Sequence, residues 1–432
     1  MQSLARCKAL FKPIKPAKSE YPMFARANLR KFLILSSHPL HNLVDKVAVI
    51  ITRRKTMKQS ITTLLPMLAV MATPFISNAN QVANDAPKIL MVLSSYGEKN
   101  SDGELVKPGY EFDEMSKSYL VFKAAGTHVT FASPKGGELV TDQYDAKKAY
   151  NAEFLADESA VKALSSSLKL TDVNADEFDA VYIVGGKGPM YDLATDPQVK
   201  TIIKDVYEDN GIVAAVCHGP AALLDVKLSD NSYLVDGKRI SAFTNLEESV
   251  FTKKWQLPFS LQDKLQGQGA NYQQDGLMLN QVSIDGRIIT GQNPFSTADS
   301  AVAVVAKLGL DSKDLPRFKD DNTIKLMEQF YADSDNASAT FKAQPEQYNP
   351  MLLAMIGVYQ AKHAQSEVER NVALQVMQQT QDIINHPMLD ITMAKTFIVQ
   401  NEQDKAISLL KASQLKFPEN EQISGLLNKL AD

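Results

Sequence analysis

Cysteine and histidine are scarce in this sequence. Its 432 residues contain two cysteines, Cys7 and Cys217, and six histidines. Cys7 lies before residue 80, where we expect the mature chain to begin after a signal peptide is removed. The mature chain then has one cysteine, so we expect no internal disulfide. The histidines beyond residue 79 lack the paired spacing of metal ligands, which predicts that the protein holds no metal ion. These are His128, His218, His363 and His386.

An excess of positive charge is absent from most of the chain. Residues 80–432 hold 33 basic and 48 acidic side chains, a net charge of −15, whereas residues 1–56 carry a net charge of +10. Hydrophobic residues make up 44% and charged residues 22% of the chain, as in ordinary soluble globular proteins. An acidic body argues against non-specific nucleic-acid binding. We therefore expect no nucleic-acid partner.

A long unbroken hydrophobic run is absent as well. The apolar run over residues 61–76 is short and is interrupted by Pro66 and Pro74, so it makes a poor membrane span. Met57–Ala79 instead has the basic start, apolar centre and small residues before Asn80 of a secretory signal peptide. We expect a periplasmic or secreted protein without stable membrane insertion after cleavage. An uncleaved N-terminal anchor is the alternative.

The 56 residues before Met57 are unexpected ahead of a signal peptide. They show no convincing pattern of helices or strands. We interpret residues 1–56 as an over-extended start of the reading frame or as a basic pre-region, and place Met57 as the true start.

Cys217 follows directly after an apolar run, Ile212–Val216, that is typical of a buried strand. Ala215 and Gly219 lie two residues to either side of it. Small residues at these positions allow the sharp strand-to-helix turn called a nucleophile elbow. A thiol at the start of a helix is expected to have a lowered pKa. A lone free thiol in an exported protein further suggests that it is kept for its reactivity.

Short apolar strands alternate with helical segments over residues 80–310. Helices are expected over residues 111–125 and 196–210, and a polar, partly helical stretch over 141–178 is an insertion or a lid. This alternation predicts an α/β fold with a largely parallel, flavodoxin-like sheet between layers of helices and a site at the carboxyl ends of the strands. The expected strands are 88–95, 127–134, 180–184, 212–216, 238–243 and 281–291, the last a hairpin about Asp285 and Gly286.

Strand signals stop near residue 311, and residues 311–432 read as helices. Residues 348–387 and 389–418 each resemble a helical pair closed by proline, and 394–420 resembles a tetratricopeptide repeat. We expect an all-helical module that packs on the α/β domain or binds a protein partner. A plain helical bundle is the alternative.

Residues 88–310 resemble the PfpI family of the class I glutamine amidotransferase-like superfamily, in its heat-shock chaperone and glyoxalase III (protein deglycase-like) branch. The motifs that carry the resemblance occur in the family's order. They are Pro108–Glu114, Phe131–Gly137, Gly185–Leu193, Ala215–Leu224, Phe243–Glu248 and Thr290–Pro294.

The resemblance implies roles for individual residues. Cys217 matches the family's nucleophile, and Glu114 matches the glutamate that contacts the nucleophile and shuttles a proton. His218 matches the histidine that follows the nucleophile, and Glu248 the acid that orients it, with Glu247 as the competing choice. The backbone N–H groups of Gly186 and His218 are the expected oxyanion donors.

Two positions depart from the family pattern. Lys117-Ser118 replaces a His-Pro pair three residues after Glu114, and Lys187 replaces a histidine in the Gly-Gly-His-Gly turn. These changes predict a more cationic pocket in which Lys187 contacts the substrate. They leave the identity of the substrate open.

The resemblance implies a cofactor-independent enzyme of glyoxalase III (D-lactate dehydratase) type. It would convert methylglyoxal or a related 2-oxoaldehyde to a 2-hydroxy acid through a hemithioacetal on Cys217. One alternative is a cysteine amidohydrolase or peptidase that uses Cys217 and His218. Another is a periplasmic chaperone or thiol redox sensor whose helical module binds clients. Relatives are often dimers, so a homodimer is an expectation by analogy.

Overall fold

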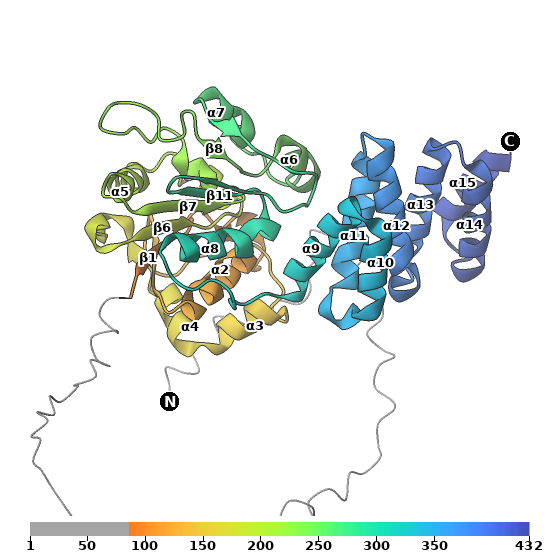
Figure 1. Ribbon diagram of the computed structural model, residues 1–432, viewed down its shortest axis with the longest axis horizontal. Coiled ribbons are helices and arrows are strands. Elements are labelled where there is room, and N and C mark those ends of the chain that lie inside the picture. Colours follow the sequence, from red (N-terminus) through yellow and green to blue (C-terminus); the bar gives the residue numbers. More distant parts are fainter. Residues whose placement is uncertain (1–85, 432) are drawn as a thin grey trace, which may run out of the picture. The chain divides into compact units, whose positions relative to one another are not determined.

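The computed structural model describes residues 86–431. The expected signal peptide, residues 57–79, and the segment 1–56 lie outside these residues. Within them, an α/β domain is followed by an all-helical region (Figure 1).

The α/β domain is built on one seven-stranded sheet with the strand order β10-β11-β7-β6-β1-β4-β5. Neighbouring strands are parallel except for β10 and β11, which form the expected antiparallel hairpin. The strands are short, and β1, β6, β7 and β11 are almost wholly buried, as expected for the centre of a sheet covered on both faces. The strands are β1 (Lys88–Val92), β4 (His128–Ser133), β5 (Leu168–Lys169), β6 (Ala180–Ile183), β7 (Ile212–Val216), β10 (Val282–Asp285) and β11 (Ile288–Gly291).

The two faces of the sheet support two separate hydrophobic cores. Alternate residues of β1 point to opposite faces, so Leu90 and Val92 pack with the helix α5 (Pro197–Glu208), while Ile89 and Met91 pack with α2 (Phe112–Ala124) and α8 (Thr297–Lys307). Figure 1 shows these helices on either side of the strands. The fold is therefore the predicted sheet between helical layers, and its strand ends meet at one edge.

Two local predictions need correction, and the partly helical character of the insertion is confirmed. The expected strand over residues 238–243 is reduced to β8 (Arg239–Ile240), which pairs with β9 (Asn271–Tyr272) in a separate small sheet. The insertion 141–178 forms α3 (Ala149–Ala156) and α4 (Glu158–Ser165), and α3 packs on α2. The segment after Cys217 is a 3-10 helix of five residues, Gly219–Leu223, since Pro220 and three small residues pack tightly there. The remaining elements of the domain are β2 (Glu98–Lys99), β3 (Leu105–Lys107), α6 (Asn245–Phe251) and α7 (Leu261–Gly267).

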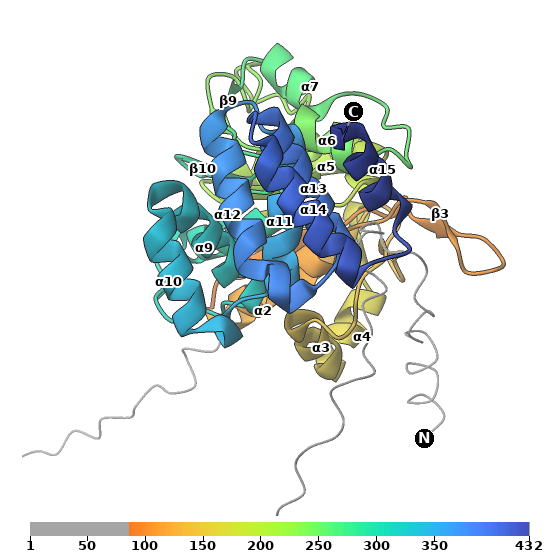
Figure 2. The same ribbon diagram turned by 90° about the vertical axis from the view of Figure 1, so that its right-hand side faces the viewer.

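The C-terminal region is all helical, as predicted. The two expected helical pairs are α11 with α12 and α13 with α14, which lie side by side in Figure 2. Pro350 and Pro387 begin α11 and α13, where a proline costs no hydrogen bond. The helices are α9 (Lys319–Ala332), α10 (Ser334–Ala343), α11 (Pro350–His363), α12 (Glu367–Ile384), α13 (Pro387–Val399), α14 (Gln403–Lys416) and α15 (Glu421–Ala431).

The helical region packs on the α/β domain through a shared hydrophobic core. Leu277, Met278 and Leu279, from a loop of the α/β domain, are buried among residues of α9 and α11 such as Met327 and Leu353. We call α9–α15 the helical module. Within residues 86–431, no helix is long and apolar enough to cross a membrane.

Candidate active site

Cys217 lies in the turn between β7 and the following 3-10 helix, with a backbone φ of 60°. This left-handed conformation is unfavourable for a residue with a Cβ, and it commonly marks a functional turn. Its backbone is fixed on both sides, because the Cys217 N–H donates to Gly291 and its carbonyl accepts from Phe243. A Cβ on Gly219 would lie 2.5 Å from the Ile183 carbonyl oxygen, which explains the glycine after the elbow. The predicted nucleophile elbow is therefore present.

Glu114 lies on the first turn of α2 and is 1% exposed. Its Oε2 accepts the backbone N–H of Gly185 at 2.8 Å, and the carboxyl lies against the Cys217 thiol. Gly185 separates the two groups, since a Cβ there would lie 2.6 Å from Glu114 Oε2 and 2.8 Å from Cys217 Cβ. The structure thus brings the predicted nucleophile and the predicted proton shuttle into contact.

Burial changes the acidity of both groups. It raises the pKa of Glu114 to about 8, although the contacts with Cys217 and Gly185 work in the opposite direction. Burial, followed by the charge of Glu114, raises the pKa of Cys217 well above its ordinary value. The short 3-10 helix has little dipole to oppose this, so the pKa of the thiol is raised rather than lowered as expected. The resting pair at neutral pH is a thiol beside a protonated carboxyl.

His218 lies between the thiol and Glu248. Its Nδ1 is 3.6 Å from Cys217 Sγ, and its Nε2 is 3.7 Å from Glu248 Oε1. The imidazole packs on the ring of Phe243, with 4.4 Å between ring centroids. Desolvation lowers the pKa of His218, although Glu248 opposes this shift, so the ring is neutral at pH 7 and can accept a proton.

Of the two acids considered for orienting His218, Glu248 faces it and Glu247 does not. Glu247 is 1% exposed and accepts hydrogen bonds from Thr244, Met278, Gln292 and Asn293. Its carboxyl group therefore links the loops around the site through hydrogen bonds.

Gly186 and Lys187 also line the site. Gly186 has a φ of 88°, and a Cβ on it would lie 2.4 Å from the Glu111 nitrogen. Its backbone hydrogen bond to Cys217 lowers the pKa of the thiol. Lys187 is 7% exposed and forms an ion pair with Asp142 at 3.3 Å. The insertion that begins near residue 141 thus contributes a counter-charge to the site.

Cys217, His218, Glu247, Gly186 and Lys187 help to line a cavity of about 60 Å³. A water molecule needs roughly 10–15 Å³ of such space, so the cavity accommodates a molecule of a few heavy atoms. Within residues 86–431, no three His, Cys, Asp or Glu side chains are gathered so as to hold a metal ion. The cavity is lined by Glu111, Gly186, Lys187, Cys217, His218, Phe243, Glu247, Phe251, Thr252, Met278, Asn293, Pro294 and Phe295.

Several of these residues were not identified from the sequence. Glu111 lines the cavity, and burial together with Asp113 and Asp142 raises its pKa well above the ordinary value. The sequence feature that could have identified Glu111 is its position one helical turn before Glu114. Phe251 ends α6 and Met278 lies in a loop, neither belongs to a motif, and both pack with the core of the helical module.

The α/β domain is similar to known proteins. Residues 104–307 match the DJ-1/PfpI family. A glutathione-independent glyoxalase of Schizosaccharomyces pombe is 31% identical over 237 residues, which cover 50% of this chain and 94% of that protein. Glyoxalase 3 of Candida albicans is 31% identical over 235 residues, covering 51% of this chain and 97% of that protein.

Among solved structures, the crystal structure of glyoxalase III from Candida albicans matches 52% of this chain and 98% of its own chain. The identity is 28% and the TM-score is 0.47. The sequence matches cover nearly the whole of the relatives but half of this chain, so the helical module lies outside the shared region. By its α/β domain, the chain belongs to the DJ-1/PfpI family.

Proposed function

We propose that this protein is a glyoxalase III-type enzyme that converts methylglyoxal or a related 2-oxoaldehyde to a 2-hydroxy acid without a thiol cofactor. The contact between Glu114 and Cys217 is the observation that carries the proposal, because this reaction needs a proton shuttle beside the sulfur. Relatives that are 31% identical are named glutathione-independent glyoxalase and glyoxalase 3. The small cavity suits a three-carbon substrate.

The reaction begins at the thiol. His218, neutral at pH 7, accepts the proton of Cys217 through Nδ1, and the sulfur forms a bond to the aldehyde carbon. Backbone N–H groups of Gly186 and His218 donate to the oxygen that becomes negative. His218 returns the proton to this oxygen, and the product of this step is a hemithioacetal.

Glu114 then moves a proton between the two substrate carbons. Its carboxylate removes the hydrogen from the former aldehyde carbon and returns a proton to the neighbouring carbon, and the hydroxyl proton of the hemithioacetal moves to the neighbouring oxygen. This leaves a thioester on Cys217 and a hydroxyl group on the neighbouring carbon. Water breaks the thioester and releases the 2-hydroxy acid and the thiol. One substrate carbon is oxidised while the other is reduced, so the sequence balances without an external oxidant.

The raised pKa of Glu114 predicts the pH dependence of this chemistry. Only the carboxylate form removes a proton, and with a pKa of about 8 it is the minor form at pH 7. We expect kcat/KM to rise between pH 6 and pH 8.

The proposal is tested by measuring lactate formed from methylglyoxal in thiol-free buffer, with protein beginning at Asn80. We expect turnover in the wild type and none in Cys217→Ala. A wild type that makes no lactate while Cys217 remains intact and alkylatable would refute the proposal.

A cysteine hydrolase of PfpI type is the second candidate. The position of His218 between Cys217 and Glu248 favours it, because this order is that of a nucleophile, base and orienting acid. Such a hydrolase would not need Glu114, so Glu114→Gln would remain active on amide substrates. The redox-sensor alternative has less support, because the burial and raised pKa of Cys217 are opposite to those of sensor thiols.

We also propose that the enzyme is exported after cleavage before Asn80. The apolar run and small residues of Met57–Ala79 support this proposal. N-terminal sequencing of the protein from a periplasmic fraction would begin at Asn80. An intact start at Met57 in a membrane fraction would instead favour an uncleaved anchor.

A further inference from the structure

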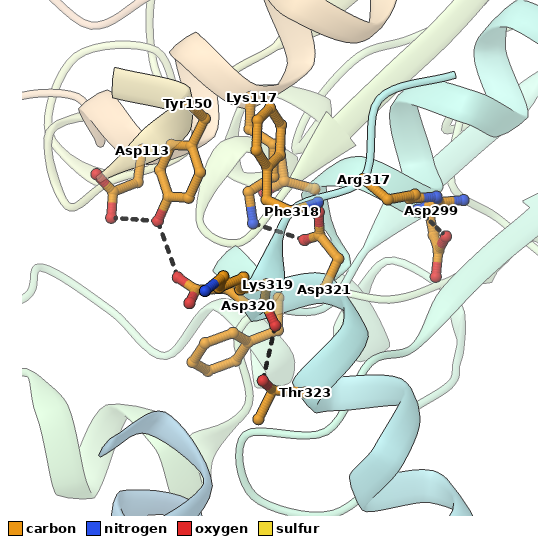
Figure 3. Close-up of polar contacts among 12 residues, drawn as sticks. Asp113, Lys117, Tyr150, Asp299, Arg317, Phe318, Lys319, Asp320, Asp321 and Thr323 are labelled. Carbon is orange, nitrogen blue, oxygen red and sulfur yellow. Dashed lines mark hydrogen bonds and ion pairs between the residues drawn. The ribbon is translucent and has the colours of Figure 1, made fainter. Parts of the chain in front are cut away.

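The helix that carries Glu114 is tied to the helical module by a buried ion pair. Lys117 lies one turn after Glu114 on α2, and its side chain is 4% exposed. Its Nζ lies 2.7 Å from Oδ1 of Asp321 on α9, which is 5% exposed. The same ammonium lies over the Tyr150 ring, 4.7 Å from its centroid. Figure 3 shows Lys117 and Asp321 directed at each other from the two parts of the chain.

The Asp321 carboxylate is also hydrogen-bonded within its own helix start. Its Oδ2 accepts the backbone N–H of Phe318 at 2.9 Å, at the start of α9. Phe318 in turn packs edge-on against Tyr150, with 5.2 Å between ring centroids. The hydrogen bond at Oδ2 therefore orients the Asp321 carboxylate so that Oδ1 faces Lys117.

A second set of contacts runs parallel to the first. The Tyr150 hydroxyl lies 3.2 Å from Oδ2 of Asp113 on α2 and 3.1 Å from Oδ2 of Asp320 on α9 (Figure 3). Asp320 Oδ1 also accepts from Asn349, which caps α11. The start of α2 is thus joined to two helices of the module.

Because the Lys117–Asp321 ion pair is buried, the loss of either partner should be costly. Loss of one partner leaves the other charge buried without compensation, which is strongly unfavourable. An unpaired Lys117 would have to reach water, and its position on α2 means that the helix would move with it. Glu114, one turn away, touches both Gly185 and Cys217, so a small shift of α2 separates the reacting groups.

We infer that Asp321 is a positioning residue of the active site: through Lys117 it fixes α2 and so holds Glu114 against Cys217. The helical module thereby becomes part of the catalytic apparatus. This inference rests on the proposed role of Glu114 as the proton shuttle. The module lies outside the region shared with the glyoxalases described above, and Lys117 stands where the family pattern has histidine, so the arrangement belongs to this chain.

The test compares three full-length variants, each beginning at Asn80. Asp321→Asn removes the charge but keeps the shape, and Lys117→Met with Asp321→Leu removes both charges. Asp335→Asn, at an exposed acid of α10, is the matched control. Each protein is measured for kcat and KM with methylglyoxal, for its melting temperature, and for the pH midpoint of Cys217 alkylation by iodoacetamide.

We expect Asp321→Asn to lower kcat by roughly tenfold or more with little change in KM, as for a small displacement of a catalytic group. The charged and titratable groups that face Cys217 are Glu114, Glu111, His218 and Tyr272. Because Glu114 raises the pKa of the thiol, its withdrawal should move the alkylation midpoint to lower pH. The double variant should recover the wild-type kcat and midpoint, and Asp335→Asn should not change either.

Three outcomes would overturn the inference. The first is a folded Asp321→Asn protein with wild-type kcat and alkylation midpoint. The second is a loss of activity that matches its unfolded fraction, which indicates a purely structural role. The third is a double variant as impaired as the single one, since the uncompensated charge of Lys117 would then not be the cause of the loss. If the wild type makes no lactate, the proposed function fails, and the alkylation midpoints still decide the position of Glu114.

Discussion

At the scale of single residues, the site depends on two buried neutral acids, Cys217 and Glu114, in contact with each other. Cys217 and Glu114 are both buried, and burial raises the pKa of each, while the charge of Glu114 raises the pKa of Cys217 further. The sequence identified both residues, because the elbow motif and the family pattern mark them. It did not predict the raised pKa of Cys217, since that depends on burial and on the short 3-10 helix after the elbow.

The first prediction concerns the pH dependence of stability. The folded protein raises the pKa of Glu114 from 4.5 to about 8, so it retains a proton that the unfolded chain releases. This contribution is fully present below pH 4.5 and is lost as the pH rises to about 8. Between these values, the wild type should lose on the order of a few kcal/mol more unfolding free energy than Glu114→Gln, at about 1.4 kcal/mol per pKa unit.

The measurement is chemical denaturation of both proteins across this pH range. Parallel curves for the wild type and Glu114→Gln would show that Glu114 ionises normally. The account of the paired neutral acids would then be wrong.

The second residue-scale prediction concerns Glu248. Its carboxylate raises the pKa of His218 against the effect of burial, so Glu248→Gln should make the imidazole a weaker base. We expect kcat to fall by roughly tenfold to a hundredfold, within the range for impaired acid–base catalysis. Glu248 and His218 are 3.7 Å apart, so a mutant with unchanged kcat at pH 7 would exclude this role.

At the scale of secondary-structure elements, the sheet brings the site together from separate segments. The turns after β6 and β7 supply Gly185, Gly186 and Cys217, and the first turn of α2, which packs on one face of the sheet, supplies Glu114. Hydrophobic alternation and glycine positions were sufficient to predict the main strands and the elbow. They were insufficient for β8, whose short pairing with β9 depends on a contact between distant loops.

The prediction at this scale concerns the glycine after the elbow. A Cβ on Gly219 would lie 2.5 Å from the backbone oxygen of Ile183, which cannot yield without distorting β6. Gly219→Ala should therefore lose about 1–3 kcal/mol of unfolding free energy, the usual cost of overpacking, and should displace Cys217. Gly267→Ala is the matched control, because Gly267 ends α7 and has no atom within 4 Å of the added Cβ.

Denaturant melts and the alkylation rate of Cys217 check this prediction. The control should match or slightly exceed the stability of the wild type, since alanine favours a helix. Equal stability of the two variants would mean that the elbow tolerates a side chain at position 219.

At the scale of the whole molecule, the helical module packs behind residues that line the cavity. Phe251 and Met278 line the cavity and also pack against the module, and the Phe251 ring meets Tyr359 of α11 at 5.1 Å. Gln360 adds a hydrogen bond to the Leu277 carbonyl at 3.0 Å. The sequence predicted an all-helical region but left open whether it packs on the α/β domain. That question depends on side chains of two distant segments, which no local pattern reveals.

A chain that ends after Leu310 tests this arrangement. Removal of the module would expose the apolar surface of Leu277, Met278 and Leu279, which are at most 5% exposed in the full chain. We expect the shortened protein to bind a hydrophobic dye and to lose the sharp unfolding transition of the full chain. A monomeric, cooperatively folded product with wild-type Cys217 alkylation would show that the module is separable.

The central claim is that Glu114 and Cys217 act together on a 2-oxoaldehyde. The most direct measurement is lactate formation from methylglyoxal by Glu114→Gln beside Glu111→Gln, a neighbouring cavity carboxyl on the same side of the site. We predict that Glu114→Gln loses turnover almost completely while Cys217 remains alkylatable, and that Glu111→Gln keeps a substantial part of the wild-type rate. Turnover by Glu114→Gln equal to that of Glu111→Gln would contradict the account.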